Sequence, residues 1–397
     1  MTTTNITISG GERLPLGALL ALAMTGFLAL LTETIPAGML SQISEGLGVS
    51  EAFAGQFVTL YAIGSLVAAI PLTKATLGWR RRPLLIMALL ALLIFNTLTA
   101  FTSSYIVALG ARFLAGMAGG LIWGMLAGYA RRMVPDHLKG RALSVAGIGA
   151  PLALCLGVPL GTLLGATLGW RSAFAIISLL TAAVLAWIFL QVSDYPGQEA
   201  EKRTPVCRVF VIPGVRPVLA VLALWVLAHS ILYTYVMPFL APAGLANRVD
   251  LVLLVFGIAS LAGIWITGLL IDRMLRALVL LSLAGFALSA LALGVAGTQP
   301  PVVYLAVMVW GLTFGGSGAL LQTALAEASG PGADIAQSIL VTAWNIAIAA
   351  GGIIGGVLLE TIGVSAFPWS LLALLLPGLA IAWISSTHGF PIRFSPG

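Results

Sequence analysis

Long apolar runs, separated by short polar or basic segments, dominate the chain. A helix needs about 20 apolar residues to cross the roughly 30 Å hydrocarbon core of a bilayer. Runs of that length predict twelve spans, over residues 15–37, 53–73, 83–102, 105–129, 142–165, 172–192, 217–240, 251–271, 277–297, 301–325, 336–359 and 366–386. Strands of a transmembrane β-barrel would instead alternate apolar and polar residues. The pattern therefore predicts an all-α membrane protein.

Hydrophobic residues make up 60% of the 397 residues, while charged residues make up only 8%. A soluble domain carries roughly 25% charged residues. A soluble core cannot bury this much apolar surface, so the composition excludes a soluble enzyme, a disordered protein and a small secreted module. The two cysteines, Cys155 and Cys207, offer neither a disulfide framework nor metal-ligand spacing. We therefore expect no metal and no cofactor.

The distribution of basic residues predicts the orientation of the chain in its membrane. If the N-terminus is cytoplasmic, the segments predicted on that side hold 16 of the 19 Lys and Arg residues. The other side holds Arg171 and Arg248, and Arg112 lies inside a span. Because Lys and Arg concentrate on the cytoplasmic side, we expect both termini there, in a bacterial inner membrane. The same bias accounts for the net charge of +6 without a nucleic-acid partner.

A polar, proline-containing stretch falls at the middle of the chain and separates six spans from six. The predicted parts are a tail (1–14), a six-helix bundle (15–193), a cytoplasmic linker (194–216), a second six-helix bundle (217–388) and a tail (389–397). A weak repeat at an offset of 194 residues pairs Arg82 with Arg276, Gly161 with Gly355, and Gly169 with Gly363. Parallel repeats of this kind place a substrate site between the halves, near the midplane.

Three ionisable residues lie deep in predicted spans, where a charge costs about 2.5–3.5 kcal/mol on insertion scales. Glu33, in a mostly apolar cavity, can gain and lose a proton near neutral pH, unless it lies at the membrane surface. Arg112 stays charged, so it can hold an anionic group, tune Glu33 or clamp backbone carbonyls. His229 titrates in the physiological range, but it can equally be a neutral side chain bonded to a hydroxyl.

Other polar and aromatic side chains within the spans are candidates to line a cavity, although packing between helices explains many of them equally well. They are Gln56, Tyr61, Trp123, Trp225, Tyr233, Tyr235, Trp310, Gln322 and Asn345.

Glycine and proline cluster in the fifth span of each half, where close helix contacts or a sliding contact between the halves are both expected. The gating candidates there are Gly157, Pro159, Gly161, Gly352 and Gly355. After the eighth span, Asp272, Arg273 and Arg276 can form an ion pair or a helix-end contact that closes an inner gate.

The residues Gly268–Arg273 with Arg276 resemble the loop motif of the major facilitator superfamily. The resemblance extends over nearly the whole chain, and it implies two pseudo-symmetric six-helix bundles. The first copy of the motif departs from the family pattern, because Lys74 and Thr76 stand where an acidic residue is expected. The usual gate charge pair of the first half is therefore in doubt.

Further motifs narrow the resemblance to the 12-span drug:proton antiporter branch, which includes bacterial exporters of sugars, purine nucleosides and drugs. Arg112 with Gly116 and Gly120 resembles the span-four motif, whose arginine is associated with proton coupling. The fifth span resembles the antiporter motif, with Val158 separating its glycine from its proline. Thr32–Leu40 resembles the span-one motif of the branch.

The resemblance implies proton-coupled efflux of a small organic molecule by alternating access. Glu33 would carry the proton, Arg112 would tune it, and His229 would be a second site. Uptake by a symporter or facilitator is the alternative. A ligand-binding receptor and a membrane enzyme are less favoured, because the sequence shows neither a signalling domain nor a catalytic set. The expected partners are the substrate and the bilayer, and the expected state is a monomer.

Overall fold

The computed structural model describes residues 14–69, 71–76, 78–135, 138–197, 212–329 and 333–390, and these contain helices and no strand. The predicted tails over residues 1–13 and 391–397 lie outside the described residues. So does most of the predicted linker, including Cys207.

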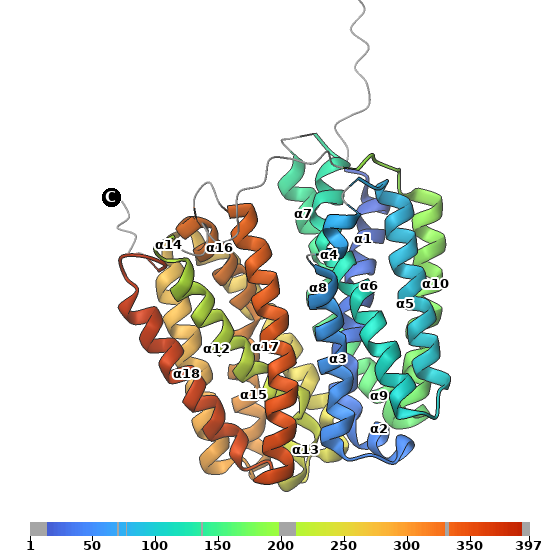
Figure 1. The fold of residues 1–397 in the computed structure, drawn as a ribbon. Helices are drawn as coiled ribbons and strands as arrows, with labels where there is room; N and C mark the ends of the chain where they lie inside the picture. Colours follow the sequence, from blue (N-terminus) through green and yellow to red (C-terminus); the bar gives the residue numbers. More distant parts are fainter. Residues whose placement is uncertain are drawn as a thin grey trace, which may run out of the picture.

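The first bundle is blue to green in Figure 1. Its elements are α1 (Leu16–Thr34), η1 (Ile35–Met39), α2 (Leu40–Leu47), α3 (Glu51–Ala69), α4 (Pro71–Ala75), α5 (Arg81–Phe101), α6 (Tyr105–Arg132), α7 (Lys139–Gly147), α8 (Gly149–Leu152), η3 (Ala153–Gly157), α9 (Val158–Leu168) and α10 (Trp170–Gln191).

The second bundle lies beside the first and is yellow-green to red in Figure 1. Its elements are α12 (Val215–Thr234), α13 (Val236–Leu240), η4 (Ala241–Ala243), η5 (Ala246–Arg248), α14 (Val249–Ala296), α15 (Pro300–Gly315), α16 (Ser317–Ser329), α17 (Ala333–Thr361) and α18 (Ala366–Ile384). We call the end of the molecule where α1 begins and α18 ends the terminal end, and the opposite end the far end.

Eleven helical segments in the described ranges are long and apolar enough to cross a membrane. The longest includes α14, whose 48 residues would extend about 72 Å at 1.5 Å per residue, more than twice the thickness of a bilayer core. Met274 interrupts α14 with non-helical angles, φ −131° and ψ 27°. The two parts correspond to the predicted spans 251–271 and 277–297, so the prediction of twelve crossings is confirmed.

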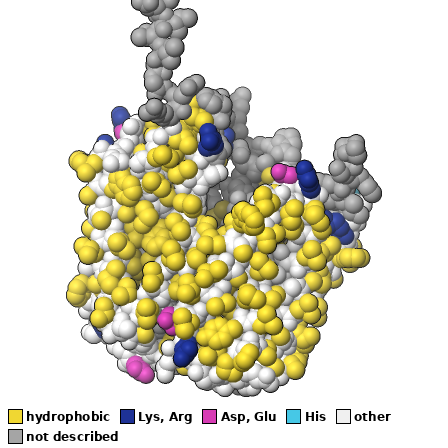
Figure 2. Space-filling model, turned by 180° about the vertical axis from the view of Figure 1, so that it is seen from behind, with side chains coloured by type: hydrophobic (Ala, Val, Ile, Leu, Met, Phe, Trp, Pro, Cys, Tyr) yellow, Lys and Arg dark blue, Asp and Glu magenta, His cyan; other side chains and the backbone are white. Residues whose placement is uncertain are grey.

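The lateral surface is apolar, as a lipid-facing surface must be. Figure 2 shows hydrophobic side chains over most of one face, with the visible charged side chains near the two ends. Large apolar residues are exposed on helices of both bundles, for example Leu179 at 71% and Leu281 at 66%. Because lipid replaces water here, this exposure does not weaken the fold.

The repeat between the halves is visible in their contacts. The guanidinium of Arg82 donates to the carbonyl of Phe189 and lies 5.1 Å from the centre of its ring. Arg276 donates to the carbonyl of Trp383 at 2.7 Å and lies 5.9 Å from its ring. Both members of the second pair follow those of the first by 194 residues. The predicted offset therefore relates spatially equivalent contacts.

Glycine allows backbones to touch at equivalent places in both halves. A Cβ added to Gly120 of α6 would lie 2.9 Å from the Cα of Ser65 in α3. A Cβ added to Gly315 of α15 would lie 2.7 Å from the Cα of Ser260 in α14. These small residues let the fourth span of each half pack directly on its second span.

A π-helical turn widens the fifth span where it meets the other half. Pro159 has no N–H, so the carbonyl of Cys155 cannot receive the usual i→i−4 bond, and the N–H of Val158 donates five residues back, to Ala153. A Cβ on Gly257 of α14 would lie 2.5 Å from the Cα of Cys155. The bundles therefore touch at this turn.

The predicted sliding contact between the halves does not lie at Gly157 and Gly161. A Cβ on Gly157 would lie 2.9 Å from the ring of Phe27 in α1, and one on Gly161 would overlap Ile35 of η1. Both glycines therefore face their own half. Gly352 of α17 does face the other half, where a Cβ would overlap the hydroxyl of Thr59 in α3.

We predict that Gly116→Ala destabilises the protein by about 1–3 kcal/mol, the usual range for overpacking. The new Cβ would lie 2.7 Å from the carbonyl carbon of Tyr61, which is backbone and cannot rotate away. Thermal unfolding in detergent measures the effect. Gly110→Ala on the same helix is the control, because nothing lies within 4 Å of its Cβ position. Equal melting temperatures for the two variants would contradict this packing.

Candidate functional site

Glu33 lies in the last turn of α1, just before the 3-10 turn η1 that contains Pro36. Its side chain is only 7% exposed, so the surface alternative does not apply. Within the described residues, its carboxyl forms no hydrogen bond and no ion pair. Three titratable groups are close enough to interact with it electrostatically: Arg112 of α6, Tyr61 of α3 and Tyr233 of α12. Since Tyr233 belongs to the second bundle, Glu33 lies near the contact between the halves.

Arg112 is completely buried and connects three helices. Its Nε donates to the carbonyl of Phe57 in α3 at 3.1 Å, and its Nη2 donates to the carbonyl of Thr32 in α1 at 2.8 Å. The guanidinium also lies over the ring of Tyr61, at 4.9 Å. Its Nη1 has no hydrogen-bond partner among the described residues. Arg112 thus clamps backbone carbonyls, one of the three predicted roles, and keeps one donor group available.

Asn96 of α5 joins this group, and our sequence analysis missed it. Its side chain is fully buried and its Nδ2 donates to the hydroxyl of Thr32 at 3.0 Å. Asn96 is a polar residue inside an apolar run, as Asn345 is, so the same criterion could have found it.

His229 lies within aromatic rings and is partly buried. It stacks on Phe314 with ring centres 3.5 Å apart and an angle of 4°. The indole Nε1 of Trp310 donates to its Nδ1 at 3.2 Å. An indole nitrogen can only donate, so Nδ1 must be unprotonated and the imidazole is neutral in this arrangement. The neutral alternative therefore fits this structure, with an indole rather than a hydroxyl as the partner.

The rings around His229 form what we call the aromatic cluster: His229, Tyr233, Phe256, Trp310 and Phe314. They come from α12, α14 and α15, and Phe256 and Trp310 are 4.5 Å apart. Tyr233 extends from this cluster towards Thr34 and Glu33 in the first bundle. Phe256 and Phe314 were not predicted, because a phenylalanine in an apolar span carries no distinguishing signal.

The remaining cavity candidates are not gathered into one place. Tyr61 is buried, and its hydroxyl donates to the carbonyl of Ala29 at 3.0 Å. Trp123 lies beside Gly26 of α1. Asn345 donates to the carbonyl of Val341 on its own helix at 2.9 Å.

Two further candidates differ in their surroundings. Trp225 is buried beside the aromatic cluster, with its ring centre 6.5 Å from that of Phe314. Gln322 of α16 is exposed. Three of the cavity candidates therefore lie close to the predicted ionisable residues. Tyr233 and Trp310 contact His229, and Tyr61 contacts Arg112.

Gln56 and Tyr235 link the two bundles instead of lining a cavity. Within the second bundle, the hydroxyl of Tyr235 donates to the carbonyl of Gly352 at 2.7 Å. From the first bundle, the Nε2 of Gln56 lies 3.4 Å from both that hydroxyl and that carbonyl. Ser50 donates to Glu360 at 2.7 Å in the same region. We call these five residues the polar seam. It joins the far ends of α3 and α17, which converge there in Figure 1.

The small residues of α17 make room for the polar seam. A Cβ on Gly355 would lie 2.7 Å from the ring of Tyr235, and one on Gly356 would lie 2.7 Å from its hydroxyl oxygen. The predicted gating residue Gly355 therefore accommodates a seam side chain.

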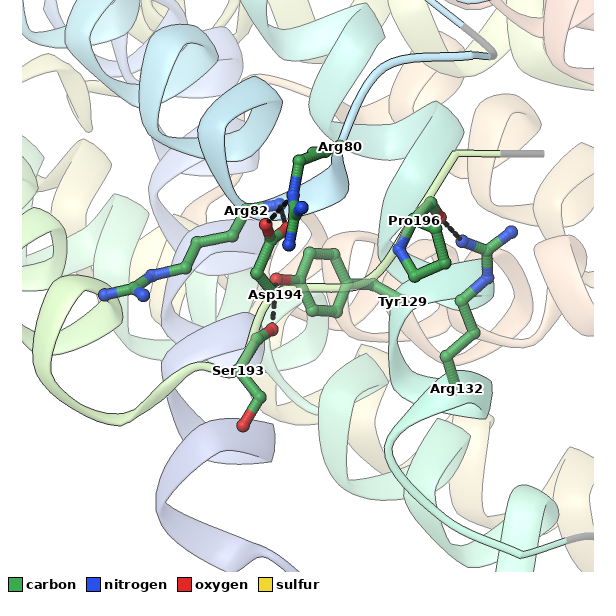
Figure 3. A network of polar contacts seen from close by, with 7 residues as sticks. All are labelled: Arg80, Arg82, Tyr129, Arg132, Ser193, Asp194 and Pro196. Atoms are coloured by element: carbon green, nitrogen blue, oxygen red, sulfur yellow. Dashed lines mark hydrogen bonds and ion pairs between the residues drawn. The ribbon is translucent and has the colours of Figure 1, made fainter.

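At the terminal end, the segment that follows α10 is tied to the loop before α5 (Figure 3). Asp194 forms an ion pair with Arg80, and its Oδ1 accepts a hydrogen bond from the backbone N–H of Arg82 at 3.0 Å. Tyr129 of α6 donates to the carbonyl of Ser193 at 2.8 Å, and Arg132 donates to that of Pro196 at 2.5 Å. Asp194, at the start of the predicted linker, therefore provides a carboxylate contact to this loop.

In the second half, Arg276 binds backbone carbonyls. Arg276 donates to the carbonyls of Ala382 and Phe390, each at 3.0 Å, as well as to Trp383. Asp272 and Arg273 are exposed on α14. Helix-end carbonyls thus bind Arg276, and the predicted gating role of Asp272 and Arg273 stays a prediction.

Burial alone would raise the pKa of the Asp194 carboxyl, but hydrogen bonds from the Arg82 N–H and from Arg80 hold it below its ordinary value. A carboxyl whose pKa is lowered by folding stabilises the protein above its unfolded pKa of about 3.9, and this contribution disappears as the pH falls through the folded pKa.

We predict that Asp194→Asn lowers stability at pH 7 by about 0.2–1 kcal/mol, the usual range for an exposed ion pair. The difference from wild type should shrink when the pH falls below about 4, where the wild-type carboxyl takes up its proton. Thermal unfolding in detergent at pH 7 and pH 3.5 measures both effects. Arg80→Gln is the matched variant, and the double variant should lose less than the sum of the two. A difference that is the same at both pH values would contradict the assignment.

The chain was compared with known proteins. Residues 22–334 match the family model of the Major Facilitator Superfamily. The purine ribonucleoside efflux pump NepI of Escherichia coli O1:K1 / APEC is 30% identical over 342 residues, which cover 85% of each chain. The protein of the same name from Shigella sonnei (strain Ss046) has the same identity and coverage.

A solved structure has the same fold. It is a bacterial homologue of the human lysosomal transporter Spinster, in an inward-facing and unoccupied conformation, with a TM-score of 0.71 and 14% identity over 98% of this chain and 100% of that one. At this identity the likeness shows the fold alone. The sequence match, the two related helical bundles and the efflux-pump relatives agree: the chain belongs to the Major Facilitator Superfamily and is a membrane transporter.

Proposed function

We propose that this transporter exports a small organic molecule in exchange for protons, by alternating access. The observation that carries the proposal is the environment of Glu33. Glu33 is buried, its carboxyl has no hydrogen bond among the described residues, and it interacts electrostatically with Arg112 of its own bundle and Tyr233 of the other.

A buried carboxylate without partners is unstable inside a membrane bundle. A proton on Glu33 and a closer approach of Arg112 are two ways to relieve this instability. The two arrangements place different charges beside Tyr233, at the contact between the halves. Proton binding can therefore favour one relative position of the bundles, which is the differential affinity that coupling requires.

The polar seam supports two alternative states. It holds the halves together at the far end, and the ribbons of the bundles diverge towards the terminal end in Figure 1. With both termini in the cytoplasm, as the basic residues favour, this arrangement is closed outwards. Export then requires the seam to separate while the terminal end closes.

The substrate class we propose is a neutral molecule with an aromatic ring, such as a nucleoside. The relatives reported above are named for purine ribonucleosides. In this chain, the aromatic cluster offers ring faces that suit stacking, and the Nε2–H of His229 is a donor not used by Trp310. We place the protein in a bacterial inner membrane.

We predict that Glu33→Gln abolishes substrate-driven proton movement. The variant keeps the shape of the side chain but cannot exchange a proton. Proteoliposomes with a pH-sensitive dye inside, given purine ribonucleosides, sugars and drugs in turn, measure the movement. We expect a loss of at least about tenfold.

The control is Glu45→Gln in α2, whose carboxyl is on an exposed residue and should be unimportant. Undiminished proton movement in Glu33→Gln would place the proton site elsewhere. Substrate transport by wild type without proton movement would identify a facilitator.

We also predict that Tyr235→Phe increases the population that is open at the far end. The variant removes the hydroxyl that accepts a bond from Gln56 of the first bundle at 3.4 Å and lies 3.3 Å from the carbonyl of Ala52. A hydrogen bond of about 0.5–1.5 kcal/mol corresponds to a change of about 2- to 10-fold in the ratio of the two states. Spin labels at positions 45 and 365, in a background without cysteine, report the far-end distance by electron–electron resonance. Tyr304→Phe, outside the seam, is the control. An unchanged distance distribution in Tyr235→Phe would show that the seam does not hold this end closed.

A further inference from the structure

Asn96 is a buried amide on a helix that does not belong to the contact between the bundles. It lies in α5, which packs mainly on α6 and α10. Its Nδ2 donates to the Thr32 hydroxyl, while its Oδ1 has no partner among the described residues. Burying an amide is unfavourable unless its bonds are made. The one described bond of Asn96 is to the residue that directly precedes Glu33.

Thr32 is bound differently from the other threonines of α1. The hydroxyls of Thr25 and Thr34 donate to carbonyls of their own helix, at 2.9 and 2.8 Å. The hydroxyl of Thr32 instead accepts a bond from Asn96 of α5, and its carbonyl accepts one from Arg112 of α6. Two neighbouring helices therefore hold the end of α1 from both the side chain and the backbone of one residue.

The group around Thr32 has one unused donor and one unused acceptor. Arg112 keeps a free Nη1 and Asn96 keeps a free Oδ1, and both side chains are 0% exposed. Buried polar atoms are normally bonded, so an incomplete group of this kind suggests that its partners change between states. Glu33, the next residue along α1, is the nearby acceptor that can use the free Arg112 donor after losing its proton.

We propose that Asn96 is a positioning residue for proton exchange at Glu33. Its bond to Thr32, together with the Arg112 clamp, holds the end of α1 so that the Glu33 carboxyl stays beside Arg112 without pairing with it. Loss of the proton then draws the free Nη1 of Arg112 to the carboxylate, and the shift passes through Thr32 to α5 and α6. This inference rests on the proposed role of Glu33.

The effect of Asn96 acts through geometry rather than charge. Among the described residues, the titratable groups that interact with Glu33 are Arg112 of α6, Tyr61 of α3 and Tyr233 of α12. Asn96 is neutral at every pH of interest. A change there alters proton exchange only by moving Glu33 relative to these three groups.

The test is the pH profile of transport in proteoliposomes, with purine ribonucleosides as the probe and proton movement as the readout. Asn96→Leu removes the amide at nearly constant volume, and Thr32→Val removes the hydroxyl that it contacts. Each should shift the midpoint of the pH profile by about 0.5–1 unit, in the same direction. The double variant should shift it no further than the larger single shift, because both changes remove one interaction.

Thr99→Val is the matched control on α5, since Thr99 is also fully buried but its hydroxyl donates to the carbonyl of Phe95 on its own helix. It should change stability without moving the midpoint. A uniform loss of rate in Asn96→Leu and Thr32→Val, with an unshifted midpoint, would reduce Asn96 to a structural residue and overturn the inference. If Asn96→Leu does not fold, Thr32→Val alone decides.

Failure of this inference is distinguishable from failure of the proposed function. If Glu33→Gln loses proton movement while both variants keep the wild-type midpoint, only the role of Asn96 is wrong. If Glu33→Gln moves protons like wild type, the proposed role of Glu33 and this inference fall together, and the proton site lies elsewhere.

Discussion

The buried guanidinium of Arg112 is the interaction around which the first bundle is arranged. A permanent charge inside a membrane protein must have acceptors, and backbone carbonyls of α1 and α3 provide them. This arrangement requires α6 to lie against both helices. Gly116 and Gly120 permit its close contact with α3, because they have no side chain to separate the backbones. The carbonyl of Thr32 is held in place as a result, and so is the backbone of Glu33, the next residue in the sequence.

The second bundle has the same close packing, and none of its described residues is a buried Lys, Arg, Asp or Glu. Gly315 meets Ser260 as Gly120 meets Ser65, so the backbone contact between the second and fourth spans is repeated. Where the first half has its polar group, the second has the aromatic cluster around His229. The two halves therefore share a scaffold but differ in chemistry. The ionisable group of the first bundle, which includes Glu33, therefore lies near the aromatic cluster of the second, which includes Tyr233.

The contacts that join the halves are of two kinds. At the fifth span, the π-helical turn around Cys155 touches Gly257 of α14, which is close packing of backbones. At the far end, the polar seam uses hydrogen bonds from Gln56 to Tyr235 and Gly352, and from Ser50 to Glu360. Hydrogen bonds between small surfaces are individually weak, which suits a contact that must open and close. The ion pair of Asp194, in contrast, lies within one half and secures its terminal end.

The sequence by itself determined the membrane class, the twelve crossings and the repeat, because lipid imposes length and apolarity on every span and the matching arginines and glycines keep their spacing. It also singled out Glu33, Arg112 and His229, since a polar group in an apolar run is conspicuous. Only the tertiary structure decided their partners: carbonyls for Arg112, an indole for His229, and Asp194 for the loop that lacks an acid. These partners lie 55 or more residues apart, and the packing of the helices, not the local pattern, brings them within bonding distance.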